Sequence, residues 1–249
     1  MYFKTGVAQI PAHGKSRVKV LNTTLIDPAE RPALNYQNLK ARQRETRDSF
    51  PHSLSLRVHR ALSWLKRAEQ ELEDHDARFI FLWVAFNAAY SNQVPDRQSS
   101  SERILFQGFL DRLIDSDSEN LLYELVWERF SGAIRLLIDN QFVFQPFWDF
   151  HNGLLTEEEW QAAFRKSKAA ARKALGSMDT RKVMGVMFDR LYTLRNQLLH
   201  GGATWNSTVN RSQIAQGAEI MGQVVPIVIH LMMNDHERVW GEACYPVIE

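Results

Sequence analysis

Cysteine is nearly absent from this sequence of 249 residues, which contains only Cys244. A single thiol excludes a disulfide within the chain and a metal site built from several thiolates, and it fits a reducing compartment. The sequence also lacks a His-Glu-x-x-His pattern and any cluster of cysteine and histidine ligands. We therefore expect that the protein has no metal site and no other cofactor.

Long apolar runs are missing as well. No run approaches the roughly 20 residues needed to cross a bilayer, and residues 1–6 contain no apolar signal core. The formal net charge is only +1, which excludes a uniformly basic coat and leaves local patches as the means of contacting nucleic acid. With 45% hydrophobic and 24% charged residues, the composition is that of a globular protein, and we expect it in the cytoplasm with no membrane contact.

The two ends of the chain carry little pattern. Residues 1–52 show no helical repeat and contain scattered proline, glycine and asparagine, which predicts a mostly irregular N-terminal arm. Polar and apolar residues alternate over residues 17–21 of this arm, which fits a short edge strand. Residues 237–249 are not informative and form a C-terminal tail.

Between the ends, residues 53–236 have a helical pattern, with apolar residues recurring at steps of three and four. Residues 79–90 are apolar on every side, which is typical of a central helix surrounded by others. Thr156 precedes three glutamates and predicts the start of another helix. Joined by short loops, such segments predict an all-α fold, an antiparallel helical bundle. The other helices are expected over residues 53–72, 102–115, 120–138, 180–200 and 214–232.

Three groups of side chains in this bundle leave alternatives open. Asn87 interrupts the apolar segment, and its amide either bonds to a neighbouring backbone group or orients a residue of a functional site. The aromatic connector over residues 140–155 either stacks on bases or, as we prefer, fills the space beneath a long loop. Five basic residues of one helix either form a solvated face or contact phosphates: Arg165, Lys166, Lys168, Arg172 and Lys173.

The most chemically suggestive feature is an arginine and a histidine five residues apart at the end of a helix. Arg195 and Asn196 are followed by His200, and two glycines then stop the helix. On an ideal helix Arg195 lies about 40° from the centre of the apolar stripe, where a guanidinium needs an anion or other acceptors. His200 lies about 140° from Arg195. The two side chains can therefore converge on one small substrate only if the helix departs from ideal geometry, or if a second copy of the chain contributes across a dimer interface.

This combination resembles the HEPN superfamily, whose mark is an Arg-x(4–6)-His motif in which a polar residue often follows the arginine. The apolar helix over residues 82–90, placed ahead of the Arg195–His200 motif, is also similar to bacterial HEPN-like proteins. The resemblance covers roughly residues 54–233. The spacing alone is not specific, because Arg47 and His52 also fit it in a segment broken by proline. The helix end, the polar Asn196 and the glycine stop distinguish the second occurrence.

The resemblance implies an HEPN-type bundle and a metal-independent endoribonuclease that works as a homodimer, typical of toxins and phage-defence components with a cognate antitoxin. By this resemblance His200 would move protons, Arg195 would stabilise charge on the phosphate and Asn196 would position the RNA, with Asn87 and Tyr192 in support. The products would be 2′,3′-cyclic phosphate and 5′-hydroxyl ends. Two other readings stay open. The chain is a non-catalytic HEPN-like module for dimerisation, partner binding or nucleic-acid binding, or Arg195 only satisfies a buried acceptor while His200 caps the helix.

Overall fold

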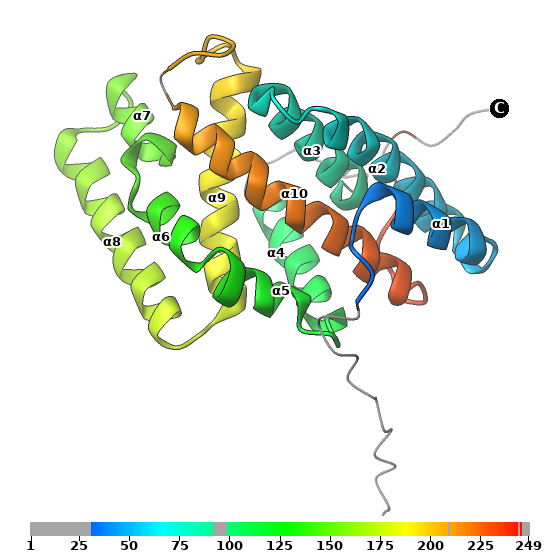
Figure 1. The fold of residues 1–249 in the computed structure, drawn as a ribbon. Helices are drawn as coiled ribbons and strands as arrows, with labels where there is room; N and C mark the ends of the chain where they lie inside the picture. Colours follow the sequence, from blue (N-terminus) through cyan, green and yellow to red (C-terminus); the bar gives the residue numbers. More distant parts are fainter. Residues whose placement is uncertain (1–30, 92–98, 209, 244, 246–249) are drawn as a thin grey trace, which may run out of the picture. The chain divides into compact units, whose positions relative to one another are not determined.

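The computed structural model describes residues 31–91, 99–208, 210–243 and 245. The chain divides into two compact units, residues 1–31 and residues 32–249, and the second contains all the elements that follow. Every regular element in the described residues is a helix, which confirms the all-α prediction (Figure 1). The strand predicted over residues 17–21 lies outside the described residues.

The helices are, in chain order, α1 (Tyr36–Thr46), α2 (His52–Gln70), α3 (His75–Tyr90), α4 (Ser99–Ser116), α5 (Leu121–Glu124), α6 (Ser131–Asp139), α7 (Gln145–His151), α8 (Glu157–Gly176), α9 (Thr180–Leu199) and α10 (Arg211–Asn234). Two short 3₁₀ turns, η2 (Arg47–Ser49) and η4 (Gln141–Val143), and one π turn, η3 (Leu125–Arg129), connect some of them. The predicted start at Thr156 is confirmed, because Thr156 and Glu159 form a reciprocal capping box at the beginning of α8.

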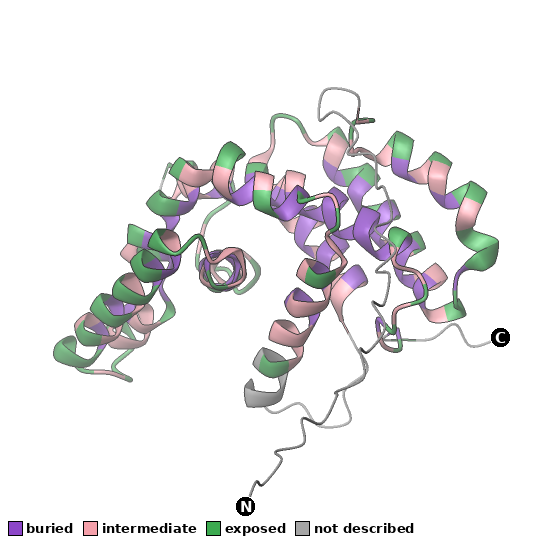
Figure 2. Cartoon of the chain, turned by 90° about the horizontal axis from the view of Figure 1, so that it is seen from below, coloured by how far each residue is buried: buried purple, intermediate pink, exposed green. Residues whose placement is uncertain are grey.

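The main core forms where α2, α3 and α10 pack against one another (Figure 1). Figure 2 shows the buried residues on the inner faces of the helices and the exposed ones on the outer faces. By length and composition alone, α10 is apolar enough to cross a membrane, but 67% of its most apolar window is buried within the protein. That burial is what a central core helix requires, because such a helix is apolar on every side.

The prediction of one helix over residues 120–138 was wrong, because the segment is divided into α5, η3 and α6. The N–H of Phe130 donates to the carbonyl of Leu125 at 3.0 Å, five residues back, which defines the π turn. In an unbroken α-helix, Ile134 would lie about 120° from Leu122. The extra residue of the π turn removes about 100° of this rotation. Leu122 and Ile134 therefore lie on nearly the same side, and both are buried.

The prediction of a mostly irregular segment up to residue 52 was wrong for residues 36–49, which form α1 and η2. The Asn35 side chain caps α1 by accepting the N–H of Asn38 at 3.0 Å. Only Leu39 and Gln43 of α1 are buried, so the sequence shows no apolar stripe. This helix depends on its packing against α2 and α10, which a search for hydrophobic periodicity cannot detect.

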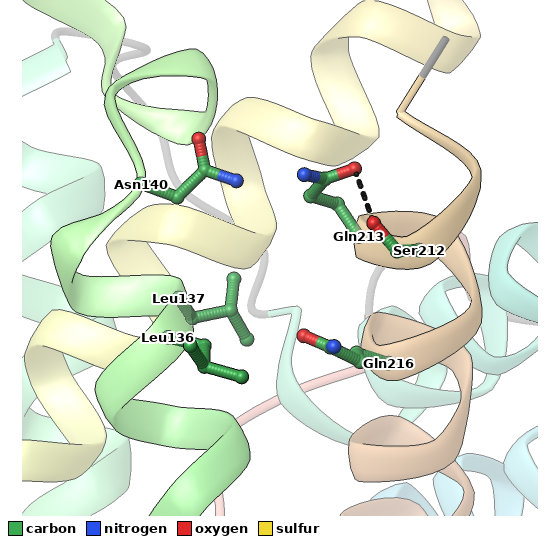
Figure 3. Close-up of a pocket in the computed structure, with 6 residues that line it drawn as sticks. All are labelled: Leu136, Leu137, Asn140, Ser212, Gln213 and Gln216. Carbon is green, nitrogen blue, oxygen red and sulfur yellow. Dashed lines mark hydrogen bonds between the residues drawn. The ribbon is translucent and has the colours of Figure 1, made fainter. Parts of the chain in front are cut away.

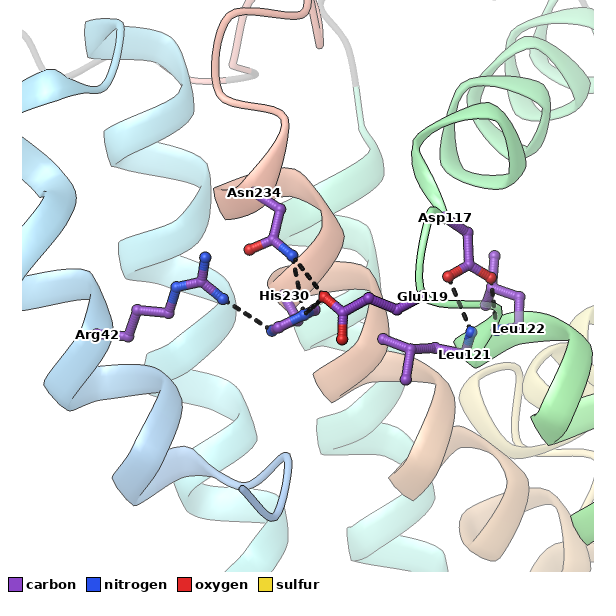
Figure 4. Close-up of polar contacts among 7 residues, drawn as sticks. All are labelled: Arg42, Asp117, Glu119, Leu121, Leu122, His230 and Asn234. Carbon is purple, nitrogen blue, oxygen red and sulfur yellow. Dashed lines mark hydrogen bonds and ion pairs between the residues drawn. The ribbon is translucent and has the colours of Figure 1, made fainter. Parts of the chain in front are cut away.

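A polar network ties α1 to α10 (Figure 4). Arg42 Nη1 lies 3.0 Å from His230 Nδ1, and His230 Nε2 lies 3.0 Å from Glu119 Oε1. Because a guanidinium can only donate, Nδ1 accepts from Arg42, and the Asn234 amide nitrogen lies 2.9 Å from Nε2 and donates to Glu119 Oε1 at 3.1 Å. Beside this network, the Asp117 carboxylate accepts the backbone N–H groups of Leu121 and Leu122 and so holds the first turn of α5.

Candidate active site at the end of helix α9

Helix α9 begins where the sequence predicts it. The Asp179 side chain accepts the N–H of Lys182 at 3.0 Å and caps the helix. Met184, Met187, Leu191 and Leu194 form the predicted buried stripe. This apolar face fixes the rotation of α9 against the core, and it therefore determines which residues of the last turns remain accessible.

The glycine stop is also observed. His200 is the C-terminal capping residue, and its N–H donates to the carbonyl of Asn196 at 3.0 Å. Gly201 has φ +72°, a left-handed conformation that favours glycine at this position. The chain therefore turns away immediately after His200, whose side chain is exposed at the end of the helix.

Arg195 lies at the edge of the buried stripe and is half-buried. Its Nη1 donates to Oδ1 of Asn196 at 2.9 Å, and its guanidinium lies 5.7 Å from the centre of the Tyr192 ring. Within the described residues, no carboxylate pairs with this cation, and its Nε is buried without a hydrogen-bond partner. Among these residues Arg195 is therefore a positioned cation with no neutralising carboxylate, which is an arrangement suited to binding an anion.

Four residues cover the accessible side of the last two turns of α9. On a helical wheel, Tyr192, Asn196, Leu199 and His200 span about 100°, with Arg195 at one edge. Tyr192 and Leu199 are 47% and 45% exposed. The structure thus places Tyr192, Asn196 and His200 on one side of the end of α9, and Arg195 lies about 140° from His200 beyond the edge of this side.

Asn87 lies farther away along the neighbouring helix. Trp83 of α3 contacts Tyr192, and Phe86 stacks on Phe188 with ring centroids 4.9 Å apart. Asn87 is therefore level with Phe188, which is seven residues or about 10 Å along α9 from Arg195. The fold does not bring Asn87 to the Arg195 guanidinium, and its role in support of the site remains a prediction.

The five basic residues of α8 lie on another surface. The buried stripe of α8, which includes Trp160, Phe164 and Ala171, faces inward, and Ser167 accepts a hydrogen bond from Arg190 of α9 at 3.0 Å. The basic side chains lie on the flanks and outer side of α8: Arg165, Lys166, Lys168, Arg172 and Lys173. Lys168 covers the Phe164 ring and Arg172 lies 3.7 Å from Asp139.

The aromatic connector forms a second, smaller hydrophobic cluster. Phe144, Phe147, Trp160 and Phe164 are buried together, with Trp148 and Phe150 packed against them. The preferred interpretation, a hydrophobic filling of the space beside a connector, is confirmed for these side chains. Phe142 is exposed at the rim of the cluster.

The segment after His200 is held by two acidic residues that the sequence reasoning did not select. Asp74 caps α3, and its other oxygen accepts the indole N–H of Trp205 at 2.9 Å. The bond from the N–H of Ala77 lowers the pKa of the Asp74 carboxyl. Asp76, only 4% exposed, accepts the N–H of Asn206 at 3.1 Å and pairs with Arg211. The only local sequence feature that indicates these contacts is the Asp-x-Asp pattern at the start of α3. The partners of Asp74 and Asp76 lie more than 120 residues away in the chain.

Gln197 was also missed, although it lies inside the motif. Its Nε2 donates to the carbonyl of Phe142 at 2.6 Å, and its Oε1 accepts from Asn210 Nδ2 at 3.2 Å. Gln197 therefore ties the end of α9 both to the turn η4 and to the start of α10. On a helical wheel, Gln197 lies about 100° from Asn196.

Comparison of the chain with protein-family models, with curated proteins and with solved structures finds no match. Across the residues with described positions, no three His, Cys, Asp or Glu side chains are grouped so that they could hold a metal ion.

Proposed function

We propose that the protein is a metal-independent endoribonuclease of the HEPN type that acts as a homodimer. The observation that carries this proposal is the Arg195 guanidinium, which is held by Asn196 and the Tyr192 ring, has no carboxylate partner within the described residues and lies in the same last turns of α9 as the exposed His200. A fixed cation and an exposed imidazole that meet across a dimer interface can serve both charge stabilisation and proton transfer at a phosphodiester.

In the proposed reaction, a neutral His200 accepts the proton of the ribose 2′-hydroxyl. The 2′-oxygen attacks the adjacent phosphorus, the bond from phosphorus to the 5′-oxygen breaks, and a protonated histidine returns a proton to that leaving oxygen. The products are a 2′,3′-cyclic phosphate and a 5′-hydroxyl. Arg195 stabilises the negative charge that builds up on the phosphate oxygens, and Asn196 keeps the guanidinium in place.

A second copy of the chain is part of the proposal. The helix of α9 continues to Leu199, so Arg195 and His200 point about 140° apart on one chain, as expected for an ideal helix. A partner that packs against the exposed Tyr192 and Leu199 would place a second His200 near the first chain's Arg195. The cleft between the two copies would then contain both a proton acceptor and a proton donor.

The test is cleavage of single-stranded RNA by the purified protein in EDTA. We expect 2′,3′-cyclic phosphate ends, and a loss of about 100-fold or more in rate for Arg195→Ala and for His200→Ala. Arg44→Ala removes an exposed arginine of α1 and should leave the rate within about twofold of the wild type. An EDTA-sensitive activity, or cleavage that survives both site substitutions, would refute the mechanism.

The same variants test the biological setting that the proposal includes, a toxin or phage-defence component restrained by an antitoxin in the cytoplasm. Bacteria expressing His200→Ala should grow better than those expressing the intact protein at equal protein levels. If the purified protein dimerises and binds RNA but leaves it intact, the non-catalytic HEPN-like module becomes the better description.

A further inference from the structure

A cleft of about 190 Å³ lies between the end of α6 and the start of α10 (Figure 3). Its lining contains no charged side chain, although 24% of the residues of the chain are charged. Leucines on α6 form its apolar part, and four neutral polar side chains complete it. The residues that line the cleft are Leu136, Leu137, Asn140, Ser212, Gln213 and Gln216.

Three amides leave hydrogen-bonding groups unused at this cleft. Oδ1 of Asn140 accepts the N–H of Phe142 at 2.8 Å, and because a backbone N–H can only donate, the Asn140 nitrogen must be the end that faces the cleft. Oε1 of Gln213 accepts from Ser212 at 3.1 Å, which leaves the Gln213 nitrogen free. Figure 3 shows the two nitrogens facing one another across the cleft, while the amide oxygen of Gln216 points toward the same space.

These groups define the chemistry of a ligand. Two donors and one acceptor are complementary to a ring edge that presents two carbonyl oxygens on either side of an N–H group. Among the RNA bases, uracil has this edge, whereas cytosine presents an amino group in place of one carbonyl. The Leu136 side chain, which is 63% exposed, provides an apolar surface for the face of such a ring, and the absence of charge fits a neutral base.

The cleft is connected to the proposed catalytic surface through Gln197. This residue lies between Arg195 and His200 and bonds to Phe142, two residues after Asn140, and to Asn210, two residues before Ser212. Both walls of the cleft are therefore fixed to the last turns of α9. A base bound in the cleft would belong to the same RNA strand whose phosphate reaches the end of α9.

We propose that this cleft binds a uracil base of single-stranded RNA and so sets the sequence preference of the protein. This inference rests on the proposed ribonuclease function. Unstacked bases of single-stranded RNA are commonly read through hydrogen bonds to this edge, and each well-made set of such bonds gives an appreciable preference over the wrong base.

The test measures binding and cleavage separately. Binding of fluorescent oligouridine and oligocytidine to the His200→Ala variant is followed by anisotropy, so that the RNA stays intact. We expect oligouridine to bind at least about tenfold more tightly than oligocytidine. Cleavage of the same two RNAs by the wild-type protein is then compared.

Asn140→Asp, placed in the His200→Ala background, keeps an oxygen for the N–H of Phe142 and replaces the free donor by a second oxygen. The ratio of the two affinities should fall to about twofold or less. Asn152→Asp introduces the same charge on an exposed residue at the end of α7 and should leave the ratio unchanged. Gln213→Glu keeps an oxygen for Ser212 and replaces the second free donor by an oxygen, so it should also reduce the ratio, and it guards against misfolding of the first variant.

Each outcome bears on the inference. A preference for oligouridine that disappears in Asn140→Asp and Gln213→Glu supports the uracil site, even if the wild-type protein cleaves neither RNA and the proposed ribonuclease function fails. Equal binding of the two RNAs, or a preference that all these variants retain, overturns the uracil site even if the RNA is cleaved. Failure to bind either RNA overturns both proposals.

Discussion

Arg190 is the most completely buried cation near the candidate site, with 2% of its surface exposed. Its guanidinium lies 4.4 Å from the centre of the Phe144 ring and 5.8 Å from that of Phe164, and it donates to Ser167 at 3.0 Å. Burial lowers the pKa of Arg190 to about 10. The residue joins α9 to the aromatic cluster, and this contact is made by the flat guanidinium rather than by an ion pair.

We predict that the flat shape of the Arg190 guanidinium raises the free energy of unfolding, whereas the burial of its charge lowers it. We expect Arg190→Lys to lower the free energy of unfolding by about 2–4 kcal/mol, because a compact ammonium would be buried without its stacking and hydrogen bonds. Arg190→Met removes the buried charge and keeps a long side chain, so its effect should stay within about 1–2 kcal/mol. Urea unfolding of the two variants measures the difference, and a methionine variant less stable than the lysine variant would contradict it.

Asp117 gives a prediction about pH. Burial raises the pKa of the Asp117 carboxyl, and this outweighs the hydrogen bonds from the N–H groups of Leu122 and Leu121, which lower it. An acid whose pKa is raised on folding favours the folded state in its protonated form. Its stabilising contribution is therefore complete below its ordinary pKa and is lost as the pH rises through the raised value.

The consequence can be measured against Asp117→Asn, which does not titrate. Urea unfolding of both proteins from about pH 4 to pH 7 should show the wild type losing stability relative to Asp117→Asn as the pH rises. If the wild type instead gains relative stability over this window, the carboxylate is stabilised by the α5 N–H groups more than burial destabilises it.

At the scale of the helices, the sequence predicts well those elements whose packing is expressed in a regular apolar stripe. The start of α8, the buried stripe of α9 and the long helix over residues 214–232 all follow from local pattern. Two elements do not. Helix α1 buries only two residues and depends on its neighbours, and η3 exists because the faces of α5 and α6 must both meet the core. The local sequence of α1 does not show its packing against neighbouring helices, and the local sequence around η3 does not show where the core lies.

Asp76, at the start of α3, holds the segment that follows His200 in place through its ion pair with Arg211. We expect Asp76→Asn to lower the free energy of unfolding by about 3–5 kcal/mol, because the substitution leaves Arg211 without its buried partner. Glu219→Gln is the matched control. It breaks the pair with Arg78, in which Glu219 is 54% exposed, and should cost at most about 1 kcal/mol. Thermal or urea unfolding compares them, and equal effects would show that burial of Asp76 is unimportant.

On the scale of the whole molecule, the candidate site consists of a local part and a part assembled by the fold. Arg195, Asn196 and His200 lie within six residues, so their spacing and the glycine stop could be read from the sequence. The anchors at Asp76 and the amides of the cleft come from segments far apart in the chain. These side chains come together only through the packing of one helix against another. The sequence pattern of a single helix does not specify that packing.

The dimer in the proposed function predicts complementation between inactive chains. Arg195→Ala and His200→Ala, each inactive alone, should recover measurable cleavage when the two chains are produced together and purified through two different tags. The mixed dimer would contain one intact arginine and one intact histidine, supplied by different copies. A dimer in which both chains carry His200→Ala is the control. Mixed dimers that form but remain inactive would show that cleavage needs both histidines or that each site is complete within one chain.

The π turn η3 also bears on how the length of this chain can vary. The turn η3 contains one residue more than an α-helical turn, and this extra residue brings Ile134 to the same side as Leu122. Deleting one residue there would let α5 and α6 join as a single regular helix with the same buried faces. A second added residue would turn α6 by about another 100° and expose its isoleucines. This position therefore tolerates the loss of a residue better than a gain, and related chains that are one residue shorter here would keep the same core.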